Sequence, residues 1–180
     1  MEELINKVIN GDSNAYKELI GMVERELYYI AKITLHNDED ANDAVSQCIY
    51  KAYVNLRSLN EKEKFKSWIR GILVNECNAI HNKNKKSIRL IEKVKMSNII
   101  KHHENSINNV NDDLDFNVLI SKLKDKEQIA LTLYYKYGCN TTDIGKILNE
   151  NPSTIKSRIN RAENKLKEML KEVENNESNV

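Results

Sequence analysis

The stretch from residue 140 to 170, NTTDIGKILNENPSTIKSRINRAENKLKEML, constrains the fold more than any other part of the sequence. Apolar residues recur at helical spacing on both sides of a short polar break, which predicts a helix over 142–148 and a turn at 149–150. A longer helix is predicted from Pro152 to about Lys171, because proline suits a first helical position, where the N–H group that it lacks would have no partner. This layout is typical of a helix-turn-helix.

The longer helix combines one apolar stripe with an opposite face rich in basic, amide and hydroxyl groups. Between residues 152 and 171 it carries six basic side chains and only two acidic ones. Lys and Arg neutralise DNA phosphates, and Arg, Lys, Asn and Ser can reach base edges in the major groove. A solvated surface helix would also show such a face, but the turn spacing and the Asn-Pro start favour DNA binding.

Composition indicates an all-α protein with room for two small domains. The 180 residues include one Pro and five Gly, and no long alternating strand pattern appears. Charge is segregated, because residues 65–104 contain nine basic and three acidic side chains although the whole chain has a net charge of +1. A basic centre between more acidic segments suggests a nucleic-acid-binding face beside protein-contact faces.

Cysteines and other reactive groups give no sign of a catalytic or metal site. Cys48, Cys77 and Cys139 are far apart in the sequence and are expected to be reduced. No Cys-x-x-Cys pair occurs and His102 and His103 have no cysteine at ligand spacing, so we expect no metal and no cofactor. The absence of a P-loop or a Ser/His/Asp pattern predicts a protein that is not an enzyme.

No targeting or membrane segment is visible in the sequence. There is no apolar run near 18 residues and no signal-peptide core. We therefore expect a cytoplasmic protein without direct membrane insertion.

Further helices are predicted on both sides of a weakly patterned central segment. Either Asp12 or Ser13 is expected to cap a long second helix, and the acidic residues 38–40 suit the start of a third because the helix dipole favours negative charge there. Trp68 is expected in the core. The predicted helices are 2–9, 13–35, 39–57, a fourth from Phe65 to the basic run Lys83, Lys85 and Lys86, then 115–123 and 125–137, with a polar loop at 57–64.

The domain limits follow from these helices and from composition. We predict a first domain over 1–86, a flexible linker rich in Asn and Lys over 87–113, and a second domain over 114–173 that contains the helix-turn-helix. A polar tail, 174–180, is expected to be disordered.

Three motifs in order resemble one protein family. They are EDANDAVSQCIYKAY at 39–53, FKSWIRGILVNE at 65–76 and DIGKILNENPSTIKSRINRAENKL at 143–166. Together they resemble the bacterial RNA polymerase sigma factors of the extracytoplasmic-function (ECF) group. The resemblance covers about 2–86 and 114–171, and the last motif is the most specific.

The resemblance implies a function in transcription initiation. The first domain would bind the coiled-coil clamp helices of the largest subunit of core RNA polymerase and read the minus-ten promoter element. The second domain would bind the polymerase flap and read the minus-thirty-five element. An anti-sigma factor, often membrane-anchored in this group, would hold the protein inactive until a stress or envelope-type signal.

The resemblance also assigns candidate binding residues. The polymerase-contacting helix carries Asp40, Asp43, Ser46 and Gln47. The minus-ten candidates are Arg57, Asn75, Lys83, Lys85 and Lys86, and the loop over 57–64 corresponds to one that captures an unstacked base. The minus-thirty-five candidates are Ser153, Lys156, Ser157, Arg158, Asn160 and Arg161. Among these, Ser157 and Arg161 lie opposite the apolar stripe, whereas Arg158 flanks it and is expected to hold a phosphate or a neighbouring helix.

Some positions depart from the pattern of the group. The group usually has Gln where Ser46 stands, an acid where Gln47 stands, Asp where Ala79 stands and Ala where Gly145 stands. These departures suggest a divergent subgroup with its own promoter preference.

Two other functions fit parts of the sequence. A stand-alone helix-turn-helix regulator would use only the second domain on DNA, and it would normally need a dimer interface, for which no heptad run appears. A helical adaptor without DNA binding would tolerate replacement of Lys156 and Arg161.

Overall fold

The computed structural model describes residues 1–94 and 114–177, and the regular elements in those ranges are all helical. The chain divides into two compact units, Met1–Glu104 and Asn105–Val180. This division falls within the predicted linker, but residues 95–113 of that linker and residues 178–180 of the predicted tail lie outside the described residues. The predicted domain limits therefore stay predictions.

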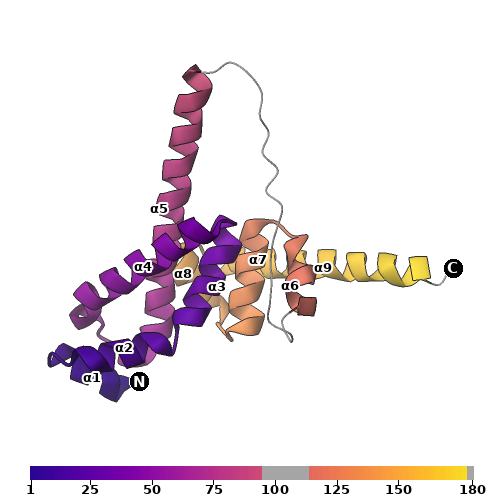
Figure 1. The fold of residues 1–180 in the computed structure, drawn as a ribbon. Coiled ribbons are helices and arrows are strands. Elements are labelled where there is room, and N and C mark those ends of the chain that lie inside the picture. Colours follow the sequence, from indigo (N-terminus) through magenta and orange to yellow (C-terminus); the bar gives the residue numbers. More distant parts are fainter. Residues whose placement is uncertain (95–113, 178–180) are drawn as a thin grey trace. The chain divides into compact units, whose positions relative to one another are not determined.

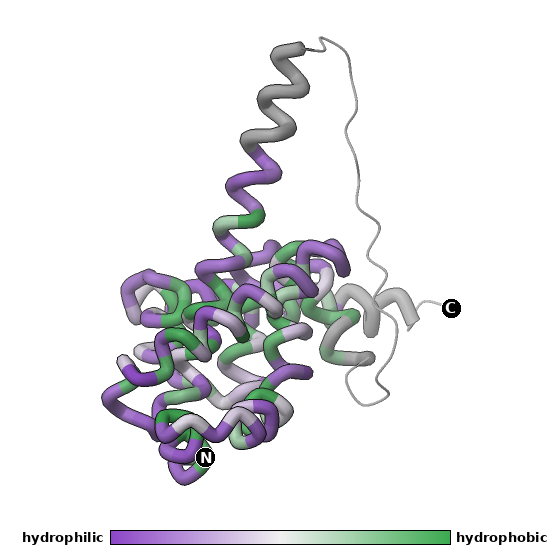
Figure 2. The backbone as a smooth tube through the Cα atoms, turned by 60° about the vertical axis from the view of Figure 1, so that its left-hand side comes forward, coloured by the Kyte–Doolittle hydropathy of each residue, from purple (hydrophilic) through white to green (hydrophobic). Residues whose placement is uncertain are grey.

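The first unit is a bundle in which α4 packs along α5 and α3 packs against both. Its fully buried side chains include Leu27, Ile30, Leu56, Phe65, Ile69 and Leu73. Figure 2 shows hydrophobic residues gathered where the helices of the unit meet. Its elements are α1 (Glu2–Ile9), α2 (Ser13–Gly21), α3 (Glu24–Leu35), α4 (Asp38–Asn55), the 3-10 turns η1 (Leu56–Ser58) and η2 (Lys62–Lys64), and α5 (Phe65–Val94) (Figure 1).

The single helix predicted over 13–35 is wrong, because the chain turns between α2 and α3. Gly21, a poor helix former, ends α2. Val23 is only 2% exposed, whereas the adjacent Met22 is 55% exposed, so the turn directs Val23 into the core. Of the two predicted caps, Asp12 is the N-cap: its carboxylate accepts hydrogen bonds from the N–H groups of Asn14 and Ala15.

The predicted break between the second and third predicted helices is confirmed. His36 ends α3 in the left-handed conformation, with φ of 54°. Asn37 then caps α4, because its side-chain oxygen accepts a hydrogen bond of 3.0 Å from the N–H group of Asp40. The acidic first turn of α4 lies where the helix dipole favours it.

The longest helix of the first unit, α5, begins at Phe65 as predicted but continues to Val94. It therefore extends past Lys86, into the segment predicted as linker. Its C-terminal end projects beyond α3 and α4 (Figure 1).

The second unit is built from shorter helices around a small core. Fully buried side chains there include Ile120, Leu131, Leu133 and Ile144. The helix predicted over 125–137 changes to a π-helical turn near its middle, and Gly138 ends it with φ of 62°, as predicted. The elements are α6 (Leu114–Ser121), α7 (Asp125–Leu131), η3 (Thr132–Lys136), α8 (Thr141–Leu148) and α9 (Pro152–Glu177).

Candidate nucleic-acid interface

The predicted helix-turn-helix is confirmed as α8, a tight turn and α9. Asn140 caps α8 by accepting a 2.8 Å hydrogen bond from the N–H group of Asp143. Asn149 takes the left-handed conformation, and the N–H group of Glu150 donates to the carbonyl of Gly145 at 2.9 Å. The turn lies so close to α8 that a Cβ atom on Gly145 would lie 2.7 Å from the Glu150 carbonyl oxygen. Glycine at this position therefore allows the close approach.

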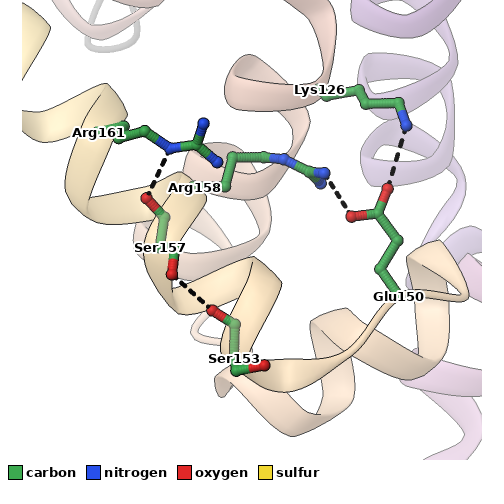
Figure 3. A network of polar contacts seen from close by, with 6 residues as sticks. All are labelled: Lys126, Glu150, Ser153, Ser157, Arg158 and Arg161. Atoms are coloured by element: carbon green, nitrogen blue, oxygen red, sulfur yellow. Dashed lines mark hydrogen bonds and ion pairs between the residues drawn. The ribbon is translucent and has the colours of Figure 1, made fainter.

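One face of α9 presents the predicted minus-thirty-five residues to solvent. The Ser157 hydroxyl donates to the Ser153 carbonyl at 2.9 Å, and Nε of Arg161 donates to the Ser157 carbonyl at 3.2 Å (Figure 3). These local bonds hold the Arg161 side chain along the helix surface. The exposed members of the predicted set are Ser153, Lys156, Ser157, Asn160 and Arg161.

Arg158 differs from the rest of this set because it is only 8% exposed. Its Nη2 atom forms an ion pair with Oε2 of Glu150, and Oε1 of the same carboxylate accepts a 3.2 Å hydrogen bond from Lys126 (Figure 3). Of the two roles expected for Arg158, a contact to a neighbouring element is the one that this geometry provides.

The Glu150 carboxylate remains ionised within this network. Burial, the largest single cause, raises its pKa, but the hydrogen bonds and the positive charges of Arg158 and Lys126 together hold the pKa below its usual value. Glu127 is similar: burial, the largest single cause, raises its pKa, but hydrogen bonds from the Lys165 side chain and the Lys124 backbone, with the charges of both lysines, together hold the pKa below its usual value. Both carboxylates therefore act as anions that join cations on neighbouring elements.

The predicted polymerase-contacting residues lie together on α4. Asp43, Ser46 and Gln47 are exposed, and Asp40 is half-buried. Oδ2 of Asp40 accepts a 2.9 Å hydrogen bond from Asn84 on α5. These four side chains form a polar, acidic surface on α4, and none of the four is basic.

An open pocket of about 430 Å³ lies between the C-terminal half of α4 and the N-terminal half of α5. Asn75, a minus-ten candidate, lines it, together with Trp68. Trp68 was expected in the core but is half-buried, and its ring lies against Phe65 with centroids 6.0 Å apart. The full lining is Lys51, Asn55, Ser58, Trp68, Ile72, Asn75 and Glu76.

The minus-ten candidates Arg57, Lys83 and Lys85 do not line this pocket. Arg57 is exposed in η1, and its Nη2 atom donates to the Ile9 carbonyl at 3.3 Å. Lys83 and Lys85 are exposed farther along α5, two positions apart and therefore on different sides of the helix. Lys86 belongs to α5, but its side chain lies outside the described residues.

Sequence reasoning missed several polar residues of the pocket. Lys51 donates a 2.6 Å hydrogen bond to Glu76 across its edge, so α4 and α5 are linked there. Asn55 and Ser58 add amide and hydroxyl groups. Lys51 and Asn55 are four positions apart on α4, which indicates a shared helix face, but only the packing of α5 shows that this face borders a cavity.

The cysteine thiols of the first unit are buried and unreactive. Burial raises the pKa of Cys48 and of Cys77 to about 12, and neither forms a disulfide. Among the described residues, no group of three His, Cys, Asp or Glu side chains could hold a metal ion. Within the same part of the chain, no helix has the length and apolarity needed to cross a membrane.

Both units match known families. Residues 19–86 match the family described as sigma-70 region 2, and residues 114–166 match sigma-70, region 4. The ECF RNA polymerase sigma factor SigW of Bacillus subtilis is 25% identical over 96% of this chain and 98% of its own length. The RNA polymerase sigma factor SigV of the same organism is 27% identical over 77% of this chain and 81% of its own.

Solved structures share the fold. The sigma factor RpoE of Bartonella quintana, solved with the anti-sigma factor NepR, gives a TM-score of 0.67 at 26% identity, over 87% of this chain and 96% of that chain. CnrH, solved with the cytosolic domain of CnrY, gives a TM-score of 0.64 over 93% of this chain and 95% of that chain. At 17% identity, CnrH supports the fold alone.

Proposed function

Since the chain belongs to the ECF group of sigma-70 factors, we propose that it binds core RNA polymerase and directs it to promoters with two recognition elements. The observation that carries this proposal is a helix-turn-helix with an exposed basic and polar face in a chain whose other unit matches sigma-70 region 2. Because both matched families are regions of sigma-70, we propose a cytoplasmic initiation factor that is not an enzyme.

The exposed face of α9 is the proposed reader of the minus-thirty-five element. Lys156 and Arg161 would contact phosphates or base edges, and Ser157 would reach a base edge in the major groove. The exposed Ser153 and Asn160 extend this face. We leave Arg158 out of the contact set because Glu150 holds it within the second unit.

The pocket between α4 and α5 is the proposed site for an unstacked base of the minus-ten element. Its volume of about 430 Å³ lies in the range of small-ligand pockets. The Asn75 amide can form hydrogen bonds with a base edge, and the Trp68 ring offers an apolar wall. Lys83, Lys85, Lys86 and Arg57 remain candidates for phosphate contacts beside it.

The acidic surface of α4 is the proposed contact for the clamp helices of the largest polymerase subunit. Asp43 is exposed and Asp40 is half-buried, so both carboxylates can approach basic partner residues, and Ser46 and Gln47 add hydrogen-bonding groups. We propose that the second unit binds the polymerase flap. Holding both readers on one polymerase would let two weak DNA sites act together through effective concentration.

An anti-sigma factor is the proposed regulator. The RpoE structure was solved with the anti-sigma factor NepR, and its fold extends over most of this chain. We propose that a comparable partner, soluble or membrane-anchored, covers the polymerase-binding surface until an inducing signal releases it.

Transcription in vitro tests the proposal. The purified protein is added to core polymerase that lacks any sigma factor, with fragmented genomic DNA as template, and transcript starts are mapped. We expect starts that depend on the protein and share two spaced upstream motifs. If no start depends on the protein and it instead binds a palindromic site as a free dimer, it is a stand-alone regulator.

Paired variants locate the two readers. Replacing Lys156 and Arg161 with Ala should abolish dependence on the minus-thirty-five motif, whereas the same change at Lys167 and Lys171, exposed farther along α9, should leave most of it. Replacing Asn75 with Ala should lower open-complex formation more than initial binding. If transcription is unchanged in both tests, the protein is better described as a helical adaptor without DNA binding than as a sigma factor.

A further inference from the structure

Glu150 joins three elements of the second unit although it lies in the turn between α8 and α9. Its side chain is 20% exposed. One carboxylate oxygen pairs with Arg158 on α9, and the other accepts the 3.2 Å hydrogen bond from Lys126 on α7 (Figure 3). The Glu150 N–H group is held by the Gly145 carbonyl of α8. Glu150 is therefore fixed both through its carboxylate and through its backbone N–H group.

Arg158 follows Ser157 directly on α9, so its side chain leaves the helix beside the proposed DNA-reading face. Its own side chain is only 10% exposed. Its Nη1 atom is buried and has no hydrogen-bond partner among the described residues. The Glu150 carboxylate is thus the counter-charge that holds this guanidinium inside, and a buried cation that loses its counter-charge is strongly disfavoured.

We propose that Glu150 is a positioning residue that determines promoter specificity: it keeps Arg158 out of the DNA interface and holds α9 so that Ser157 and Arg161 face the bases. This inference rests on the proposed function, namely that α9 reads DNA.

The physical reason is that contacts to phosphates and contacts to base edges contribute differently to affinity and to sequence specificity. An additional arginine on the DNA surface binds phosphate whatever the sequence, so it strengthens binding to all sites. Contacts to base edges alone distinguish one site from another. Releasing Arg158 therefore raises affinity for all sequences by a similar factor and steepens the salt dependence. Loss of the link between Glu150 and Arg158 also frees α9 to turn, which weakens the base contacts that only the correct sequence makes, so the ratio of affinities falls.

The chain supplies a matched control in Glu127. Both of its carboxylate oxygens lie 2.8 Å from Nζ of Lys165, so this pair also joins α7 to α9. Lys165 lies about two turns along α9 from Arg158 and about one turn beyond Arg161, the last of the residues proposed to read DNA. The substitutions E127Q and E150Q remove the same charge from the same unit, but only E150Q releases Arg158.

The test uses the full chain bound to core polymerase. Equilibrium binding is measured over a series of salt concentrations on two promoter fragments, one intact and one with the minus-thirty-five motif replaced. For E150Q we expect the ratio of affinities to fall about five- to ten-fold and the slope of log affinity against log salt to steepen by about one. For E127Q we expect both quantities to match the wild-type protein.

Two further variants separate the outcomes. R158M should retain the wild-type salt slope, and the double variant E150Q/R158M should match R158M because Glu150 acts through Arg158. A slope that becomes shallower by about one in R158M would show that Arg158 already contacts phosphate, which overturns the inference even if E150Q does not fold. An unchanged ratio and slope in E150Q would overturn it as well.

The wild-type protein itself distinguishes failure of the inference from failure of the proposed function. If wild-type protein and core polymerase show no preference for the intact fragment, the proposed function fails. If that preference is present and E150Q retains it, only the role of Glu150 fails.

Discussion

The two units of this sigma factor are both helical where the structure describes them, yet different interactions stabilise them. The first unit has long helices that meet through fully buried apolar side chains such as Phe65 and Leu73. The second unit has shorter helices around a smaller core, and two bridging carboxylates, Glu127 and Glu150, tie its α7 to the helix-turn-helix. The first unit also contains ion pairs between helices, among them Lys51 with Glu76 at the edge of the pocket and Glu26 with Arg70 deep between α3 and α5.

This difference follows from size. A small domain buries a smaller fraction of its surface, so apolar packing alone stabilises it less. Ion pairs add little net stability at exposed positions, but they are directional when partly buried. The second unit therefore gains a defined helix orientation from its charged pairs, whereas the first unit gains it from the shape of its core.

The largest expected effect is on the apolar core of the first unit. Phe65→Ala should lower the free energy of unfolding of that unit by about 3–5 kcal/mol, because Phe65 is fully buried. Urea unfolding followed by Trp68 fluorescence measures it, since Trp68 is the single tryptophan of the chain and lies against Phe65. Met22→Ala, at an exposed position, should change the value by less than about 0.5 kcal/mol.

The same Gly→Ala substitution in each unit should change the stability of the two units in opposite directions. Gly145→Ala should destabilise the second unit by about 1–3 kcal/mol, because the new Cβ would lie 2.7 Å from the Glu150 carbonyl oxygen. Gly71→Ala in α5 meets nothing within 4 Å and should stabilise the first unit by about 0.5–1 kcal/mol. Hydrogen exchange of peptides from each unit measures both, and effects of equal sign would contradict the tight turn.

Helix caps should contribute similarly in the two units. Asn37→Ala removes the cap of α4 and Asn140→Ala removes the cap of α8, and each should cost about 1 kcal/mol. The Asn140 change should raise the unfolded fraction of the second unit more than the Asn37 change raises that of the first, because the second unit has the smaller core. Urea midpoints of the two units, read from exchange of their own peptides, provide the measurement.

Acid should weaken the second unit through its bridging carboxylates. The folded-state pKa values of Glu127 and Glu150 lie below the ordinary 4.5, so their stabilising effect is complete above that pH and is lost as the pH falls through the folded values. Hydrogen exchange between pH 5 and pH 3 should show this loss, and the double variant E127Q/E150Q should show a flatter dependence. An equal slope in wild type and variant would exclude these two groups as the cause.

Most of the fold could be predicted because its signals are local. The helix-turn-helix followed from apolar spacing around a polar turn, and the break at His36 and Asn37 followed from polar residues between two apolar patterns. The prediction failed between α2 and α3, where Gly21 ends α2 although the apolar helical pattern continues. It also placed Trp68 in the core, because helical spacing does not show which buried-looking side chains border a cavity.

The sequence by itself determined the helical class, the helix-turn-helix and the polar face of α9, because helical periodicity and capping depend on residues a few positions apart. Only the tertiary structure decided that Glu150 holds Arg158 inward and that Lys51, Asn55 and Asn75 surround one pocket. Those residues come from different elements, and their meeting depends on how helices pack. Charge and spacing along the chain do not directly show how the helices pack.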